Sequence, residues 1–127
     1  MGTRSIIGYK NSDGSVTTTY CHYDGYPNHN GRVLRKKYNS DERAKAVASA
    51  GYLSVLRKQG DLEFDISESV NSEKPVVYSS VDKARKYVFT ETWAEYFYLW
   101  DDGSWYIAGH TADSALEDLE ALLASRN

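Results

Sequence analysis

The chain has 127 residues, of which 41% are hydrophobic and 26% are charged, and its net charge is −3 at pH 7. These values predict one globular domain over residues 1–127 and argue against a general nucleic-acid binder. No apolar run reaches the roughly 18 residues of a membrane span, and the residues after Met1 lack the apolar core of a secretory signal. The single cysteine, Cys21, excludes an internal disulfide and indicates a reducing compartment, although it permits a bridge between two copies.

The charge is unevenly distributed along the chain. Residues 32–58 contain eight basic and only two acidic side chains, whereas the segments that follow are mainly acidic. Such a separation is typical of solvated faces that complement each other, within one fold or between subunits. It also places a group of cations directly after the most unusual segment of the sequence, residues 20–31.

Two β-hairpins are predicted, one near each end of the chain. The first joins β-prone residues 6–9 to residues 16–20 through a turn that contains Asp13-Gly14. The second joins residues 93–100 to 104–108. With Asp102-Gly103 as its central turn residues, the predicted pairs are Trp100 with Trp105, Leu99 with Tyr106, Tyr98 with Ile107, and Phe97 with Ala108.

The signals between the hairpins are mainly helical. Apolar spacing after Pro27 predicts an amphipathic helix over residues 28–38, and Ser40 is expected to cap a second helix that ends at Gly51. Residues 52–56 are ambiguous, and the alternation in residues 60–75 indicates a short edge strand followed by a loop.

Three further elements are predicted after Pro75. Residues 76–78 are expected to form a strand, and Ser80 is expected to cap a helix over residues 81–87. Ser114 and Glu117 have the spacing of a capping box for the last helix. Its expected buried stripe consists of Ala115, Leu116, Leu119, Leu122 and Leu123.

This order of elements predicts an α+β fold. We expect an antiparallel β-sheet built from two hairpins plus a short strand, with the helices packed on one face.

Residues 20–31 contain the cysteine, two of the three histidines and three of the eleven tyrosines. Because neighbours on a strand point to opposite faces, Cys21 and His22 are poorly placed to ligate one metal ion, and no second Cys or His pair completes a tetrahedron. The same alternation leaves only His29 or His110 as a base for a Cys21 nucleophile, and no glycine-rich nucleophile elbow surrounds the cysteine. We therefore expect no metal, no cofactor and no catalytic residue here.

Non-covalent recognition fits these residues better. The turn before Pro27 leads into a predicted helix N-terminus, which favours an anion, and basic residues follow. The chemistry suits a phosphate-bearing ligand, for which the candidate binding residues are His22, Tyr23, Asp24, Tyr26, His29, Arg32 and Arg35. The alternative is that the tyrosines are core residues, His22 is a hydrogen-bonded strand residue and Asp24 only caps the turn.

A partner-binding surface is a second candidate site. Both faces of the second hairpin are rich in apolar or aromatic residues, so one face is expected to meet a ligand, another strand layer or a partner. The candidate partner-binding residues are Lys36, Trp100 and Trp105. The alternative is a cross-strand clasp between the two tryptophans.

The chain resembles a family of small, uncharacterised bacteriophage-encoded proteins, which also tend to carry a late aromatic hairpin. The residues that carry the resemblance are Thr3-Arg4-Ser5-x-Ile7-Gly8, Asn11-x-Asp13-Gly14 and Tyr20-Cys21-His22-x-Asp24-Gly25-Tyr26-Pro27-x-x-x-Gly31-x-x-Leu34. The resemblance implies a phage accessory protein that acts in the host cytoplasm against host defence.

Taken with the residues above, this resemblance leads us to expect immune evasion by binding, without enzymatic activity. The protein would act as a sponge for a nucleotide-type immune signal or as a direct inhibitor of a defence protein, and a homo-oligomer would help a small domain to enclose a ligand. The alternative is a small nucleotide hydrolase that uses His22 or His29 as general acid or base.

Overall fold

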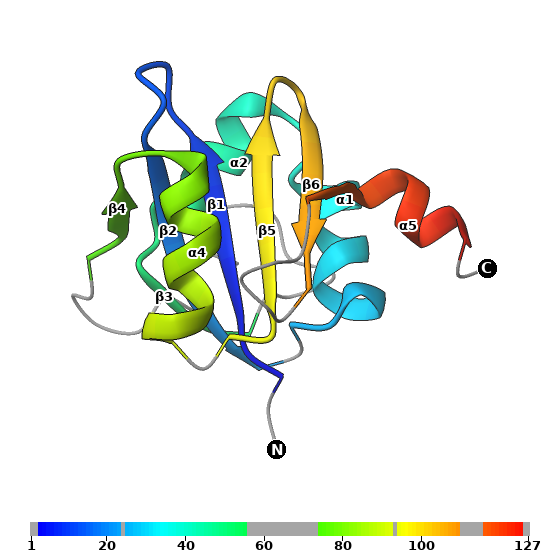
Figure 1. The fold of residues 1–127 in the computed structure, drawn as a ribbon. Coiled ribbons are helices and arrows are strands. Elements are labelled where there is room, and N and C mark those ends of the chain that lie inside the picture. The colour runs from blue at the N-terminus through cyan, green and yellow to red at the C-terminus, as the bar shows by residue number, and fades with distance from the viewer. Residues whose placement is uncertain (1–2, 24, 56–73, 93, 110–115, 126–127) are drawn as a thin grey trace.

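The computed structural model describes residues 3–23, 25–55, 74–92, 94–109 and 116–125. These residues form one seven-stranded sheet in the order β3-β2-β1-β5-β6-β7, and β4 pairs with β2 beside β3 (Figure 1). The strands are β1 (Ser5–Lys10), β2 (Val16–Tyr23), β3 (Tyr52–Val55), β4 (Val76–Tyr78), β5 (Tyr96–Asp101), β6 (Ser104–Ala108) and β7 (Glu117–Asp118). The helices are the π-helix η1 (Pro27–Gly31) and the α-helices α1 (Arg32–Lys37), α2 (Asp41–Ala48), α4 (Val81–Glu91) and α5 (Leu119–Ser125).

The sheet joins two antiparallel hairpins through a parallel pair. β1 pairs antiparallel with β2, and β5 pairs antiparallel with β6. β1 and β5 run parallel to each other, since the chain between the hairpins crosses back before β5 begins. β2 also pairs with β3 in parallel and with β4 antiparallel. The predicted α+β class is confirmed, and the pairing is mostly antiparallel.

The helices cover both faces of the sheet, which corrects the expectation that they pack on one face. Ile7, Tyr98 and Ile107 point to one face and form a buried cluster with residues of α1, α2 and α5. Their neighbours Ile6 and Phe97 point to the other face, where they pack with residues of α4. In Figure 1, α4 lies in front of the sheet, and α1 and α2 lie behind it. Helices are needed on both faces of the sheet because the side chains of β1 and β5 are buried on each side.

The second hairpin has the predicted register. Trp100 pairs with Trp105, and the three other predicted pairs are also present. Asp102 (φ 51°) and Gly103 (φ 81°) are both in the left-handed region, as a two-residue type I′ turn requires. The first hairpin is confirmed as well, with a loop between Lys10 and Val16.

Two of the three predicted helix caps are present. The Ser40 side chain accepts a hydrogen bond from the Arg43 N–H, and the Ser80 side chain accepts one from the Lys83 N–H. The third prediction is wrong: Glu117 lies in β7, and the Asp118 carboxylate accepts from the Ala121 N–H at the start of α5. β6 offers an open edge at this point, and Glu117 pairs with it instead of continuing a helix.

The other segments agree with the sequence where the structure describes them. The expected helix over residues 28–38 is divided into η1 and α1, residues 52–55 form β3, and residues 76–78 form β4 as predicted. The edge strand expected within residues 60–75 lies mostly outside the described residues, as do Ser114 and Ala115. None of the helices in the described ranges has the length and hydrophobicity needed to span a membrane.

Candidate functional site

The turn after β2 is held in place by a buried polar network. Asn30, on η1, is fully buried, and its Nδ2 donates hydrogen bonds to Ser5 Oγ (3.1 Å) and to Cys21 Sγ (3.4 Å). Ser5 and Cys21 are themselves buried on β1 and β2. The network therefore fixes η1 against the sheet, and Cys21 is a buried part of this structural network.

Gly25 holds the beginning of this turn in place through its backbone. Its N–H donates to the Thr3 carbonyl (2.7 Å), and its carbonyl accepts from the buried Tyr98 hydroxyl (2.6 Å). A Cβ at this position would lie 2.7 Å from Ser5 Cβ and from the Thr3 carbonyl oxygen. Glycine is required at this point because the backbone passes so close to β1.

The turn continues into a π-helix. The N–H groups of His29 and Asn30 both donate to the Tyr26 carbonyl (3.0 Å each). At the far end, a Cβ on Gly31 would lie 3.2 Å from Leu119 Cδ1, so α5 approaches closely. Short π-helical turns are frequent at functional sites, and this one coincides with the motif that the sequence singles out.

Tyr26 and His29 are on the outer side of this anchored turn. The Tyr26 residue is 41% exposed, and its ring centroid lies 6.3 Å from that of the half-buried His29, at an interplanar angle of 58°. Arg32, also half-buried, follows at the first residue of α1. We call Tyr26, His29 and Arg32 the turn site. The side chain of Tyr23, and Asp24 as a whole, lie outside what the structure describes.

His22 does not belong to the turn site. Its Nδ1 lies 3.0 Å from the Tyr20 hydroxyl, and the two rings are 5.9 Å apart. Tyr20 packs on the α4 face of the sheet, opposite to Cys21 and η1. Burial raises the pKa of the Tyr20 hydroxyl, and Arg4 partly opposes this rise. The alternative interpretation of His22 as a hydrogen-bonded strand residue therefore describes its geometry.

The two tryptophans are core residues. Trp100 and Trp105 are 3% and 4% exposed, and their rings form an edge-to-face pair with centroids 5.4 Å apart. Trp100 Nε1 donates to Asp41 Oδ1 (3.3 Å), and Trp105 Nε1 donates to the Tyr38 carbonyl (3.2 Å). The cross-strand clasp thus replaces the expectation of a partner surface at these rings. Lys36, the third candidate, is exposed on α1.

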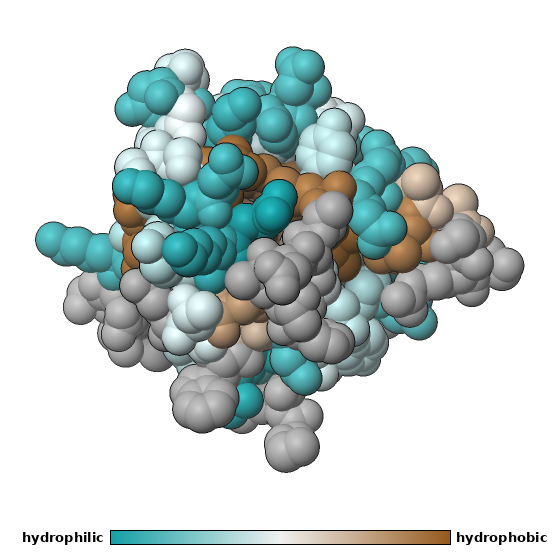
Figure 2. All heavy atoms as spheres, viewed as in Figure 1, coloured by the Kyte–Doolittle hydropathy of each residue, from teal (hydrophilic) through white to brown (hydrophobic). Residues whose placement is uncertain are grey.

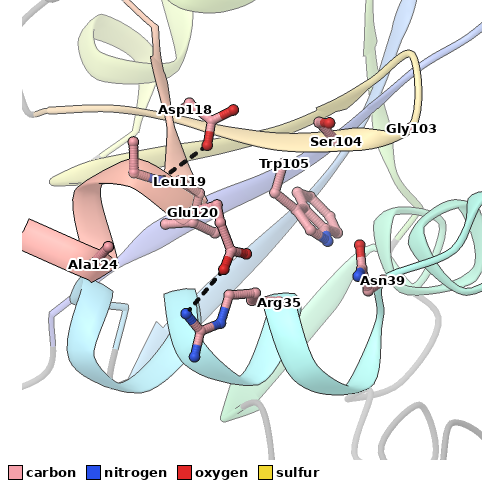
Figure 3. Close-up of a pocket in the computed structure, with 10 residues that line it drawn as sticks. Arg35, Asn39, Gly103, Ser104, Trp105, Asp118, Leu119, Glu120 and Ala124 are labelled. Atoms are coloured by element: carbon pink, nitrogen blue, oxygen red, sulfur yellow. Dashed lines mark hydrogen bonds and ion pairs between the residues drawn. The ribbon is translucent and has the colours of Figure 1, made fainter.

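Arg35 and the edge of Trp105 line a groove of about 680 Å³ between α1, β6 and the start of α5 (Figure 3). Arg35 Nη1 lies 3.4 Å from Glu120 Oε1, and this ion pair joins the α1 and α5 walls. We call this hollow the β6 groove. Its lining consists of Arg35, Asn39, Gly103, Ser104, Trp105, Asp118, Leu119, Glu120, Ala121 and Ala124.

Sequence reasoning did not identify most of this groove. Asp118 and Glu120 read as the polar face of a terminal helix, and Asn39 reads as a linker residue between two helices. The two-residue pairing of β7 with β6 and the packing of α5 in the same core cluster as α1 bring them together. No local motif marks such a site.

Metal binding has no geometric support in the described ranges, where no group of three or more His, Cys, Asp or Glu side chains could hold an ion. No protein-family model, curated protein or solved structure significantly matches the chain.

Proposed function

We propose that this chain is a bacteriophage accessory protein that counters host defence by non-covalent binding, and that it sequesters a nucleotide-type immune signal at the turn site. The observation that carries the proposal is the exposed Tyr26 ring beside His29 on a rigidly anchored π-helical turn. The resemblance to phage proteins in the same motif supports the biological setting, the host cytoplasm.

The chemistry of the turn site suits a ligand with an aromatic base and a phosphate. A tyrosine face stacks on any base, a histidine donates to phosphate oxygens, and an arginine adds a charge-assisted hydrogen bond. Because Gly25 and Asn30 fix the turn from beneath, ordering the site on binding costs little conformational entropy.

The site is on the outer surface, so one subunit encloses a ligand only partly. A second copy that covers the turn site would exclude water and strengthen the polar contacts. The proposal therefore includes a homo-oligomer, which size-exclusion chromatography with light scattering detects.

Calorimetry against a panel of cyclic nucleotides and ADP-ribose-type signals tests the proposal. We expect one member to bind, and we expect Tyr26→Ala to weaken it about tenfold or more, since stacking contributes about 1–3 kcal/mol per base. Tyr87→Ala, at a half-buried tyrosine on α4, is the matched control and should bind normally. If no member of the panel binds, the nucleotide form of the proposal is wrong.

A small nucleotide hydrolase is the rival from another class. His22 projects from the α4 face of β2, whereas His29 lies on η1 at the opposite face, so these two histidines do not share one site. Incubation with the bound nucleotide followed by chromatography separates the two classes. Intact nucleotide released by heating supports sequestration, and turnover supports the hydrolase.

Direct inhibition of a defence protein is the second form of the proposal, and the β6 groove favours it. Its wall residue Arg35 pairs with a Glu120 side chain that is 70% exposed, so both charges are accessible to a partner. A pull-down from host lysate should recover a stoichiometric partner that Arg35→Glu releases. Lys36→Glu, one residue away on α1, shows whether the partner contacts the helix outside the groove, and retention of the partner by Arg35→Glu contradicts the groove.

A further inference from the structure

A group of polar and aromatic side chains lies on the α4 face of the sheet, outside both sites described above. Tyr20 and His22 come from β2, and the Tyr20 hydroxyl lies 3.0 Å from His22 Nδ1. Tyr52, the first residue of β3, pairs with Tyr20, and the centroids of their two rings are 5.5 Å apart. All three residues are half-buried. They form one group, partly open to solvent, toward the end of the sheet where β2 finishes (Figure 1).

Arg4, immediately before β1, joins this group. In the β1–β2 pair Ser5 is opposite Cys21, so one further step of the same register places Arg4 opposite His22. Ser5 faces η1, and strand alternation therefore turns Arg4 to the α4 face. Burial raises the pKa of the Tyr20 hydroxyl and the charge of Arg4 lowers it, which agrees with a guanidinium close to that hydroxyl. We call Arg4, Tyr20, His22 and Tyr52 the α4-face cluster.

The Arg4 guanidinium has no carboxylate partner among the described residues. The two ion pairs in this part of the chain lie elsewhere, at Lys10 and at Arg35. The acidic residue Glu95 is exposed, and its backbone N–H donates to the Arg4 carbonyl (2.8 Å), which fixes the backbone at Arg4. The outer surface of α4, which covers this face, is mainly hydrophilic (Figure 2). A half-buried cation that no carboxylate neutralises attracts an anion more strongly than a fully hydrated cation does.

The donors of the α4-face cluster suit a phosphate better than a carboxylate. An arginine fork donates two parallel hydrogen bonds to either group. A neutral His22 that accepts from the Tyr20 hydroxyl at Nδ1 carries its proton on Nε2, which is a further donor. A carboxylate has two oxygens, and the fork uses both of them. A phosphate monoester has a third oxygen for the imidazole, and the Tyr52 ring adds an aromatic surface beside it.

We propose that the α4-face cluster is a second anion site, which binds a small phosphate monoester. Arg4 holds two phosphate oxygens, His22 donates to a third, and the Tyr20 hydroxyl fixes the orientation of the imidazole. The cluster and the turn site lie on opposite faces of the sheet, so this inference does not depend on the proposed function.

NMR titration of the labelled full chain with phenyl phosphate tests the site, with benzoate as the matched carboxylate. At constant ionic strength, we expect phenyl phosphate to produce a saturable shift of the His22 imidazole resonances and benzoate to bind about fivefold more weakly or less. The His22 resonances report on this cluster and the His29 resonances on the turn site, so each proposal can fail alone. No saturable His22 shift up to about 10 mM phenyl phosphate, or equal binding of benzoate, overturns the inference.

Substitutions at the cluster complete the test. Arg4→Gln should weaken phenyl phosphate binding about tenfold, and Arg4→Lys should recover part of the affinity because it keeps the charge without the fork. Lys86→Gln, at an exposed position on α4, also removes one positive charge from this face and should leave the affinity unchanged. Equal weakening by Arg4→Gln and Lys86→Gln would indicate general attraction of anions and overturn the site. If Arg4→Gln does not fold, His22→Ala replaces it: a loss of about threefold or more supports the site, and unchanged affinity overturns it.

Discussion

The turn site and the β6 groove are built in opposite ways. The turn site lies in one continuous segment, and buried contacts through Asn30 and Gly25 hold it rigidly. The β6 groove is assembled from three distant parts of the chain, whose α1 and α5 walls share one buried core cluster and are also linked by an exposed ion pair. The geometry of the turn site therefore depends on local contacts, and the geometry of the groove depends on packing between distant segments.

This difference separates residues that shape a site from residues that contact a ligand. Of the residues that make the sequence of the turn distinctive, Cys21 and Gly25 face inward and maintain the backbone. Tyr26 is 41% exposed, more than the half-buried His22 and His29. Substitutions at inward residues should therefore change stability, and substitutions at outward residues should change binding.

Gly25→Ala should be the most damaging substitution in the turn. The new methyl group would lie 2.7 Å from Ser5 Cβ and the Thr3 carbonyl, and we expect a loss of about 3 kcal/mol in the free energy of unfolding. Urea denaturation measures it. Gly14→Ala is the control, because its Cβ meets nothing within 4 Å and only its φ of 92° is unfavourable, at about 1 kcal/mol. Equal losses in the two variants would mean that the turn is not tightly anchored.

Tyr98→Phe should cause the next largest loss of stability. It removes the buried hydroxyl that donates to the Gly25 carbonyl and leaves that carbonyl unpaired, at a cost of about 1–2 kcal/mol. Tyr106→Phe, at a half-buried position on the neighbouring strand, should change stability by less than about 0.5 kcal/mol. A difference near zero between these variants would contradict a role for Tyr98 in holding the turn.

Tyr9→Phe tests the attachment of α2, which forms the far end of the same layer. The Tyr9 hydroxyl donates to the Asp41 carboxylate (2.8 and 2.9 Å), and its loss should cost about 1 kcal/mol or less. Burial, and then Asp41, raise the pKa of Tyr9 above its ordinary value of 10.0. The folded state therefore holds this proton more tightly, so the contribution is complete below about pH 10 and is lost as pH rises through the folded pKa.

Unfolding titrations from pH 8 to 12 measure this alkaline loss. The Tyr9→Phe variant should lose less stability than the wild type over the same range. The remaining loss should come from other tyrosines such as Tyr20, whose pKa is also raised by burial. Identical alkaline profiles in the two proteins would show that Tyr9 does not sense Asp41.

Glu120→Gln should have the smallest effect on stability, within about 0.5 kcal/mol, because its pair with Arg35 is exposed. Thermal unfolding at low and high salt measures it, and the variant should lose the small salt dependence of that pair. A loss above about 1 kcal/mol would mean that the ion pair supports the fold and is not available for exchange with a partner.

The sequence predicts what short-range chemistry determines. The Asp102-Gly103 turn specifies the register of its hairpin, and Ser40 and Ser80 mark helix starts through their own side chains. It does not predict the parallel β1–β5 pair or the placement of α4 on the second face, since these depend on packing between distant segments. For the same reason the sequence wrongly suggests that His22 and His29 belong to one site. In the structure they lie on opposite faces of the sheet.

The most direct test of binding at the turn site is native mass spectrometry of the protein isolated from phage-infected host cells, beside Tyr26→Ala prepared in the same way. We predict that the wild type carries an intact phosphate-bearing molecule, which heating releases unchanged, and that the variant has lost it. A wild-type protein without such a molecule, or a variant that retains it fully, would contradict the proposed function.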